Sequence, residues 1–287
     1  MVTRGDVLVT ATELARRLDA GEPVTILDVR WQLTEPDGRA AYRERHIPGA
    51  VYVSLEDELA DHTVDGRGRH PLPSGRSVDA AARRWGVRRG VPVVVYDDWN
   101  RAGSARAWWV LTAAGLPDVR ILDGGLGAWL AAGGAVEAGT VTPAPGDVTI
   151  GNADLYGGAR ATLTAAEAAA VGTLLDARAP ERFRGDVETV DPVAGHIPGA
   201  RNVPSTSVLA DDGTFLNERD LTRMLDERGV KGAGDIGVYC GSGITATVTL
   251  AALAAVGVDA ALYPGSWSEW SSDSSRPVAR GPDQPMR

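Results

Sequence analysis

The chain has 287 residues, about twice the length of an ordinary domain, and this length predicts two domains that each bury a core. Hydrophobic residues make up 44% of the sequence and charged residues 23%, proportions that exclude a disordered chain. The formal net charge of −9 argues against nucleic acid or an anionic membrane surface as the main partner.

Targeting signals and metal-ligand spacings are not recognisable in the sequence. Residues 1–13 lack the apolar core of a signal peptide, and the most apolar long segment, residues 244–256, is too short to span a bilayer. Cys240 is the only cysteine, which excludes internal disulfides, and no Cys/His cluster has the spacing of zinc ligands. We therefore expect a cytoplasmic protein that binds no metal.

The two halves of the chain repeat the same motifs in the same order. In the first half these are a Thr-x-x-Glu capping box at 10–13, "ILDVR" at 26–30, "HIPGA" at 46–50 and an apolar run that ends at Asp97. In the second half they are a capping box at 164–167, "LLDAR" at 174–178, "HIPGA" at 196–200 and an apolar run that ends at Cys240. Such an ordered series indicates a duplicated domain.

Each half alternates strand-like apolar runs with helix-like stretches. This pattern predicts an α/β fold in which each domain has a mostly parallel central sheet flanked by helices on both faces. We expect a first domain over residues 1–136, a Pro/Gly/Thr-rich linker over 137–158 and a second domain over 159–287. The polar tail, residues 271–287, is expected to be frayed.

The segment "VYCGSGITA" places Cys240 between a predicted strand and a predicted helix. Reactive groups collect at such positions in α/β sheets. A loop containing Gly241, Ser242 and Gly243 lets backbone N–H groups turn inward as an anion nest, which favours the thiolate form of a cysteine. The alternative is a small buried core residue, and glycine also suits a tight loop for backbone reasons alone. The first half has Asp97 at the matching position and so has no thiol there.

These residues together resemble the tandem-domain rhodanese sulfurtransferases, over roughly residues 6–278. The resemblance rests on the repeated "[LI][LI]D[VA]R" and "HIPGA" motifs and on a cysteine in the second copy only. The loop "CGSGIT" is similar to that of the 3-mercaptopyruvate sulfurtransferases. The family implies two rhodanese-like domains, of which only the second is catalytic.

The resemblance also implies a chemical cycle. The Cys240 thiolate takes a sulfane sulfur from a small-molecule donor and passes it to cyanide, a thiol or a thioredoxin-type protein. No organic cofactor is needed, and we expect a monomer with 3-mercaptopyruvate as the preferred donor. A thiosulfate sulfurtransferase is the alternative.

Three residues match a proton relay of the family. Ser242 corresponds to the serine of the active loop, His70 in "GRHPLPSG" to a family histidine, and Glu56 to its acidic partner. Together they would protonate the departing pyruvate enolate. The alternatives are a loop-capping hydroxyl, a solvent-exposed histidine and a surface acid.

Donor binding is expected from two arginines and from the loop. Arg182 matches the arginine that binds the substrate carboxylate, and Arg106 matches one that lines the cleft from the first domain. For both arginines an ion pair is the alternative. The remaining expected contacts come from the loop residues Gly241, Gly243, Ile244 and Thr245, the last of which could instead only cap the following helix.

One position departs from the family pattern. Some mercaptopyruvate enzymes have a second carboxylate-binding arginine about nine residues beyond the first, where this chain has Asp191. We therefore expect loose donor binding. For Arg184, a surface ion pair is the expected role.

Residues that occur in both copies are expected to be structural, because one copy has no cysteine. This group contains His46, His196, Asp28, Asp176, Arg30 and Arg178. We expect core or domain-interface positions for the tryptophans 108, 109, 267 and 270.

Two other classes of protein compete with this interpretation. Cysteine-based phosphatases of related fold use a Cys-x5-Arg loop, but the arginine position here is Ala246, which leaves the transition state without a cationic clamp. A non-enzymatic scaffold or sulfur-carrying protein is favoured by loss of the cysteine, and the cysteine is present.

Overall fold

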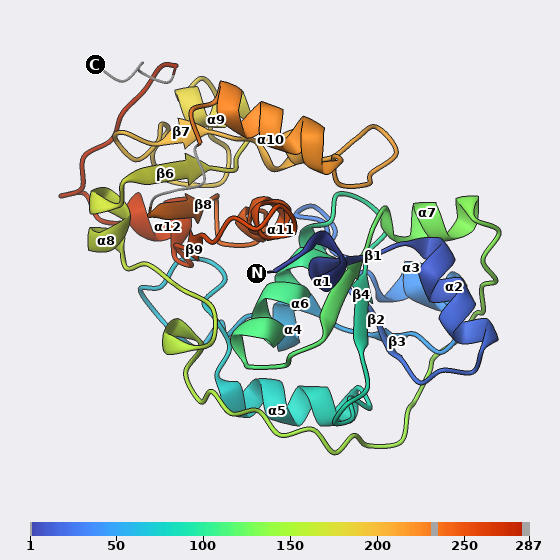
Figure 1. The fold of residues 1–287 in the computed structure, drawn as a ribbon. Coiled ribbons are helices and arrows are strands. Elements are labelled where there is room, and N and C mark those ends of the chain that lie inside the picture. The colour runs from blue at the N-terminus through green and yellow to red at the C-terminus, as the bar shows by residue number, and fades with distance from the viewer. Residues whose placement is uncertain (1, 231–234, 283–287) are drawn as a thin grey trace.

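Two parallel sheets, one in each half of the chain, form the framework of the protein (Figure 1). The structure is a computed structural model and describes residues 2–230 and 235–282. All pairings between the named strands are parallel. The predicted α/β class, with helices on both faces of each sheet, is therefore confirmed.

The first sheet has five strands in the order β1-β5-β4-β2-β3. The strands are β1 (Leu8–Val9), β2 (Thr25–Asp28), β3 (Val51–Tyr52), β4 (Val93–Tyr96) and β5 (Val119–Leu122). The helices of this half are α1 (Arg4–Val7), α2 (Ala11–Asp19), α3 (Arg39–Glu44), α4 (Leu55–Glu58), α5 (Gly75–Arg84), α6 (Ala102–Ala113) and α7 (Gly125–Ala131).

The second sheet has four strands in the order β7-β6-β8-β9. Its strands are β6 (Thr173–Asp176), β7 (Arg201–Asn202), β8 (Ile236–Tyr239) and β9 (Ala261–Leu262). The helices of this half are η1 (Leu155–Gly157), α8 (Ala165–Ala170), α9 (Pro180–Arg184), η2 (Ser205–Val208), α10 (Glu218–Glu227), α11 (Ala246–Ala255) and α12 (Ser266–Trp270). A parallel bridge between Thr162 and Leu262 stands where the first sheet has β1, so the two halves share one topology.

Strand periodicity decides which helices cover which face. In β4, Val93 and Val95 point into one hydrophobic cluster, while Val94 and Tyr96 point into another. Helices α2 and α7 cover the second face, whereas α5 and α6 cover the first (Figure 1). Successive side chains of a strand point to opposite faces, so fully apolar strands are buried on both sides.

A single hydrophobic cluster crosses from one domain to the other. Helices α6 and α11 pack against each other between the two sheets, and nearly every residue of both is buried (Figure 1). A helix that is apolar all round needs partners on every side. The interface is therefore part of the core, and the predicted core tryptophans Trp108 and Trp109 lie on α6 within it.

The expected linker and tail are both attached to the body of the protein. Along residues 137–158, Gly139 N–H donates to the Arg43 carbonyl and Gly146 N–H to the Arg83 carbonyl, so this segment is a strap across the first domain. In the tail, Ala279 and His196 form a backbone bridge, and the prediction of fraying is wrong for the described part. Residues 283–287 of that prediction lie outside the described residues.

Both capping boxes of the sequence are present, at the start of α2 and of α8. None of the helices within residues 2–230 and 235–282 combines the length and hydrophobicity of a membrane span.

We predict that Gly103→Ala destabilises the protein. A Cβ at Gly103 in α6 would overlap the backbone carbonyl oxygen of Val29, the residue after β2, and neither backbone can move without disturbing the shared core. We expect the free energy of unfolding to fall by about 1–3 kcal/mol in urea titrations. The control is Gly127→Ala in α7, where a Cβ would meet no atom within 4 Å and the change should be neutral or slightly stabilising. Equal effects of the two substitutions would contradict this account of α6.

Candidate functional site

The thiol of Cys240 lies in a tight loop at the carboxyl end of β8. The loop spans residues 240–245, and α11 begins at Ala246. The backbone N–H of Gly243 donates to Cys240 Sγ at 3.2 Å. Gly243 has a φ of +78°, and a Cβ there would lie 2.5 Å from the Pro264 carbonyl oxygen, so this position requires glycine. Backbone geometry thus points an N–H group at the sulfur.

The segment that begins α12 supports the loop from beneath. Trp267 N–H donates to the Cys240 carbonyl and Ser268 N–H to the Gly241 carbonyl, both at 2.9 Å. The hydroxyl of Ser266 accepts from Cys240 N–H at 3.1 Å. Three hydrogen bonds therefore hold Cys240 and Gly241 in place.

Asp97, the counterpart of Cys240, fills its own loop with a carboxylate. Its oxygens accept from the backbone N–H groups of Trp99, Arg101 and Ser104 at 3.0–3.3 Å and from the Ser104 hydroxyl at 2.6 Å. Arg101 also forms an ion pair with it at 2.8 Å. The anion nest of the first domain is therefore closed by its own side chain.

A pocket of about 250 Å³ adjoins the Cys240 loop and takes its walls from both domains. Cys240, Gly241, Ser242, Ile244, Thr245 and Arg182 all line it, as the sequence led us to expect. Gly243 is not among the lining residues and contacts the sulfur instead. Thr245 makes no capping hydrogen bond to α11, so the capping alternative for this residue is wrong.

Arg106 does not line the pocket, which corrects the expectation from the sequence. Its side chain is completely buried in α6 at the domain interface, out of contact with solvent. The guanidinium donates to the carbonyls of Leu59, His70 and Gly243 at 3.0–3.1 Å. Burial lowers the pKa of Arg106 to about 10, which leaves it charged at neutral pH. Arg106 is therefore a positioning residue that ties the His70 segment to the Cys240 loop.

Two members of the expected relay are in contact. Glu56 Oε1 and His70 Nε2 are 3.2 Å apart, and the indole N–H of Trp31 donates to the same Glu56 oxygen at 2.6 Å. His70 Nδ1 is buried and has no hydrogen-bond partner among the described residues. The third member, Ser242, makes no hydrogen bond to His70 within residues 2–230 and 235–282.

The pKa values of this pair move in the same direction. The hydrogen bond from His70 lowers the pKa of Glu56 to about 2, against a cost of burial, with further help from Trp31. Burial lowers the pKa of His70, although the Glu56 carboxylate opposes the shift. At neutral pH the pair is therefore a carboxylate hydrogen-bonded to a neutral imidazole.

Arg182 is engaged with two carboxylates. Its Nε and Nη2 atoms hold Glu188 side-on, with an Nη2–Oε1 distance of 2.7 Å, and Nη2 also contacts Asp191 Oδ2 at 3.0 Å. The side chains of Glu188 and Asp191 are 4% and 2% exposed. Burial raises the pKa of Asp191, although both Arg182 and Arg69 oppose the shift.

Several residues of the pocket were not found by sequence reasoning. Arg69 forms an ion pair with Asp191 across the domain boundary. Trp31, Trp99 and Asn100 of the first domain also line the pocket. The sequence carries no signal for them beyond the position of Arg69 next to His70, because their contacts depend on how the domains dock.

Residues shared by the two copies make contacts within their own domains. Asp28 and Asp176 are buried and hold Arg30 and Arg178 side-on. His46 stacks on Tyr42, and His196 stacks on Phe183. Arg178 additionally borders the pocket. Arg184 pairs with Asp186 on the surface, in agreement with the expected role.

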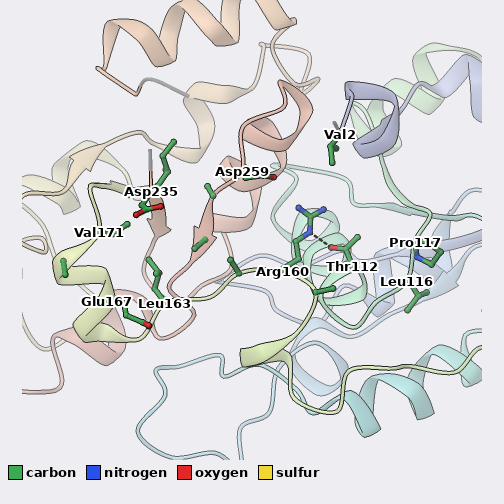
Figure 2. A pocket seen from close by; sticks show the side chains of 16 residues that line it. Val2, Thr112, Leu116, Pro117, Arg160, Leu163, Glu167, Val171, Asp235 and Asp259 are labelled. Carbon is green, nitrogen blue, oxygen red and sulfur yellow. Dashed lines mark hydrogen bonds between the residues drawn. The ribbon is translucent and has the colours of Figure 1, made fainter. Parts of the chain in front are cut away.

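A larger pocket lies elsewhere between the domains (Figure 2). It measures about 930 Å³ and is lined by residues that include Asp235 and Asp259. Arg160 lines it and donates to the Thr112 hydroxyl at 3.0 Å. The same guanidinium stacks over Trp108 at 4.2 Å. No residue of the 240–245 loop lines this pocket, so the larger pocket is separate from the one beside Cys240.

One cluster has the donor atoms of a metal site. Ligand atoms of Glu56, His62 and His70 lie within 4.8 Å of one another. The carboxylate already holds both imidazoles, at 2.9 Å to His62 and 3.2 Å to His70. The absence of a metal remains a prediction.

Known proteins resemble the chain over nearly its whole length. A sequence profile described as "Rhodanese-like domain" matches residues 10–132 and again residues 160–273. A Mycobacterium tuberculosis protein named "Putative thiosulfate sulfurtransferase SseB" is 68% identical over 98% of this chain and 99% of its own length. A Pseudomonas aeruginosa protein named "Probable 3-mercaptopyruvate sulfurtransferase" is 44% identical over 96% of this chain and 98% of its own length.

Solved structures agree with this picture. The crystal structure of SseA from Escherichia coli, titled as a 3-mercaptopyruvate sulfotransferase, has a TM-score of 0.79 and 34% identity, covering 91% of this chain and 98% of that one. A 3-mercaptopyruvate sulfurtransferase from Leishmania major has a TM-score of 0.81 and 29% identity, covering 96% of this chain and 76% of that one.

The fold and site define an enzyme with two parallel-sheet domains and a single pocket thiol. The chain belongs to the rhodanese-like family, with two copies of the domain. The prediction of a tandem-domain sulfurtransferase that acts on small sulfur donors and acceptors is confirmed at this level.

We predict that Asp97→Asn lowers the free energy of unfolding and leaves turnover nearly unchanged. The substitution removes the charge that three N–H groups, a hydroxyl and Arg101 surround, so we expect a loss of about 2–4 kcal/mol in urea unfolding. Turnover of the folded enzyme should stay within about twofold of wild type. The control is Asp98→Asn, because Asp98 only approaches Arg30 at 3.9 Å and should matter less. A loss of turnover in folded Asp97→Asn comparable to loss of the thiol would make the first domain catalytic.

Acidification should destabilise the enzyme partly through Glu56. The folded protein keeps this carboxylate ionised down to a pKa of about 2, whereas the unfolded chain binds its proton near 4.5. The contribution is therefore complete above about pH 4.5 and is lost as the pH falls toward 2. Glu56→Gln should flatten the fall in Tm between about pH 5 and about pH 3.

The exposed carboxylate of Glu44 provides the control, since Glu44→Gln should leave the slope of Tm against pH as in wild type. Identical slopes for wild type and Glu56→Gln would show that the pair with His70 does not hold in solution.

Proposed function

We propose that the protein moves sulfane sulfur through a persulfide on Cys240, with 3-mercaptopyruvate as the preferred donor. The observation that carries the proposal is the thiol with an N–H group aimed at its sulfur, in a pocket that arginines border. The loop itself offers neutral N–H and hydroxyl groups and no cation, which suits a monoanionic keto acid better than a dianion.

In the donor half-reaction the Cys240 thiolate attacks the sulfur of 3-mercaptopyruvate. A sulfur–sulfur bond forms, the carbon–sulfur bond of the donor breaks, and its electron pair moves into the enolate of pyruvate. The enolate then takes at carbon the proton that the donor thiol carried, which leaves pyruvate and a persulfide anion on Cys240. Arg182 would contact the donor carboxylate through Nη1, the one nitrogen of its guanidinium fork that neither Glu188 nor Asp191 engages.

Protonation of the enolate would use Ser242, His70 and Glu56. The Glu56 carboxylate orients the imidazole, and the unpaired Nδ1 of His70 is available to a hydroxyl or to the donor. Arg106 fixes the distance between the two segments by holding the carbonyls of His70 and Gly243. These contacts support a relay that becomes complete when the donor is bound.

In the acceptor half-reaction a thiolate or cyanide attacks the outer sulfur of the persulfide. The sulfur–sulfur bond breaks, the Cys240 thiolate leaves, and the N–H of Gly243 stabilises its charge. A small thiol, cyanide or a thioredoxin-type protein would serve as acceptor. We propose that the enzyme acts as a monomer, because both walls of the pocket come from one chain.

A thiosulfate sulfurtransferase is the second candidate. It is favoured by the name of the Mycobacterium tuberculosis relative, which is 68% identical. In that reaction sulfite would leave when Cys240 attacks the outer sulfur, and no proton would be needed. The Glu56–His70 pair would then have no chemical role, and this difference separates the two candidates.

Incubation with 3-mercaptopyruvate should add one sulfur atom to the wild type, measured by intact-mass spectrometry, and a thiol reductant should remove it. Cys240→Ser should take up no sulfur and transfer none, because a hydroxyl cannot carry sulfane sulfur. Its Tm should stay close to that of the wild type, because Ser is nearly isosteric with Cys. The kcat/KM for 3-mercaptopyruvate should exceed that for thiosulfate.

Transfer activity that survives in Cys240→Ser would contradict the persulfide mechanism. A clearly higher kcat/KM for thiosulfate, unchanged by Glu56→Gln, would assign the enzyme to the second candidate.

A further inference from the structure

A loop of the first domain delivers Arg69 to the Cys240 pocket. Gly68 has a φ of +81° and lies so close to the second domain that a Cβ there would overlap the Gly265 carbonyl oxygen. The next residue, Arg69, donates from its backbone N–H to the Ser268 hydroxyl at 3.0 Å. These contacts reach the same segment that supports Cys240, so the loop is docked where the nucleophile is held.

The guanidinium of Arg69 stands over the active loop. A Cβ built on Gly241 would lie 3.1 Å from Arg69 Nη2 and 3.5 Å from Arg182 Nη1. Arg69 Nη1 pairs with Asp191. Its Nε is buried and has no acceptor among residues 2–230 and 235–282, and within those ranges Nη2 has none either.

The unoccupied edge of Arg69 is the one that binds a carboxylate with two hydrogen bonds. In this protein Arg30, Arg178 and Arg182 all use Nε and Nη2 to hold a carboxylate side-on. Two parallel N–H groups match the two oxygens of a carboxylate. Arg69 is the pocket arginine that keeps this edge without an acceptor in the described part of the chain.

Arg182 cannot offer the same edge while Glu188 occupies it. Its contacts to Glu188 Oε1 and Oε2 are 2.7 and 2.9 Å long, and Glu188 is almost fully buried. Only Nη1 of Arg182 is left to face Gly241. A donor carboxylate would therefore meet Nη1 of Arg182 and Nη2 of Arg69, and it would gain a second hydrogen bond from Arg69 when the guanidinium turns its buried Nε toward the pocket.

We propose that Arg69, supplied by the non-catalytic domain, is the principal carboxylate anchor of the donor site, and that Asp191 orients its guanidinium through Nη1. The inference rests on the proposed function, because it assumes a donor that carries a carboxylate. It assigns the first domain a direct part in substrate binding. It also explains how a cation reaches this pocket although position 191 is acidic.

The test measures single-turnover persulfide formation on Cys240 as a function of 3-mercaptopyruvate concentration, with pyruvate as a competing carboxylate that has no sulfur. Arg69→Gln should raise the half-saturating donor concentration and the inhibition constant of pyruvate about ten- to hundredfold. Arg69→Lys should recover only part of this loss, because an ammonium has no side-on edge. Release of sulfur from preformed persulfide to dithiothreitol should not change.

Two control variants separate binding from structure. Arg67→Gln removes a cation from the same loop, where its guanidinium stacks over Tyr156 at 4.8 Å, and should leave donor binding unchanged. Asp191→Asn removes the charge of the ion pair between the domains, while its amide oxygen can still accept from Arg69 Nη1 and keep the guanidinium oriented. If Arg69 binds the donor, Asp191→Asn should weaken binding less than threefold or improve it.

If Arg69→Gln and Asp191→Asn weaken donor binding equally, Arg69 serves only to hold the domains together, and the inference is overturned. Donor binding that stays within about twofold of wild type in Arg69→Gln and falls in Arg182→Gln would also overturn it. In both cases the wild type still forms the persulfide. Failure of the wild type to take sulfur from 3-mercaptopyruvate would instead reject the proposed function.

Discussion

The buried guanidinium of Arg106 is the contact on which the arrangement of the active site depends. Among residues 2–230 and 235–282 it has no carboxylate in an ion pair, and it donates to the carbonyls of Leu59, His70, Pro71 and Gly243. A buried cation is tolerated only when its donors are paired, so these four backbone positions must stay together. Because they belong to both domains, the position of the Glu56–His70 pair relative to the Cys240 loop follows from one side chain in the shared core.

The two duplicated loops have similar backbones, but the N–H groups of the first loop bind its own side chain, whereas the second loop faces a pocket. In both halves a strand ends, the chain turns its N–H groups inward, and a long buried helix follows. Asp97 accepts those N–H groups with its own carboxylate, whereas Cys240 accepts one at its sulfur and leaves the rest of the loop facing a pocket. An anion nest filled by its own side chain contributes to stability, and a nest that holds a thiolate can do chemistry.

Charge around the pocket is balanced before any donor arrives. Three arginines, 69, 178 and 182, face three carboxylates, 176, 188 and 191, in one connected network. Neutralised cations attract an anion less than free ones do, which agrees with the loose donor binding expected from Asp191. The network also crosses the domain boundary through Arg69 and Asp191, so the charges of the pocket and the docking of the domains share the same residues.

The sequence by itself determined the duplication, the parallel α/β class and the position of Cys240 in a loop between a strand and a helix. These features are local, because strand periodicity, capping residues and a glycine-rich turn after an apolar run act over a few neighbouring residues. The two capping boxes and the loop around Cys240 could both be predicted for that reason. The tertiary structure alone decided which side chains meet across the interface. Arg106 is buried because α6 and α11 share a core. Arg69 reaches the pocket because Gly68 allows the backbones of the two domains to approach closely. Neither contact produces a periodic pattern that could be recognised in the sequence.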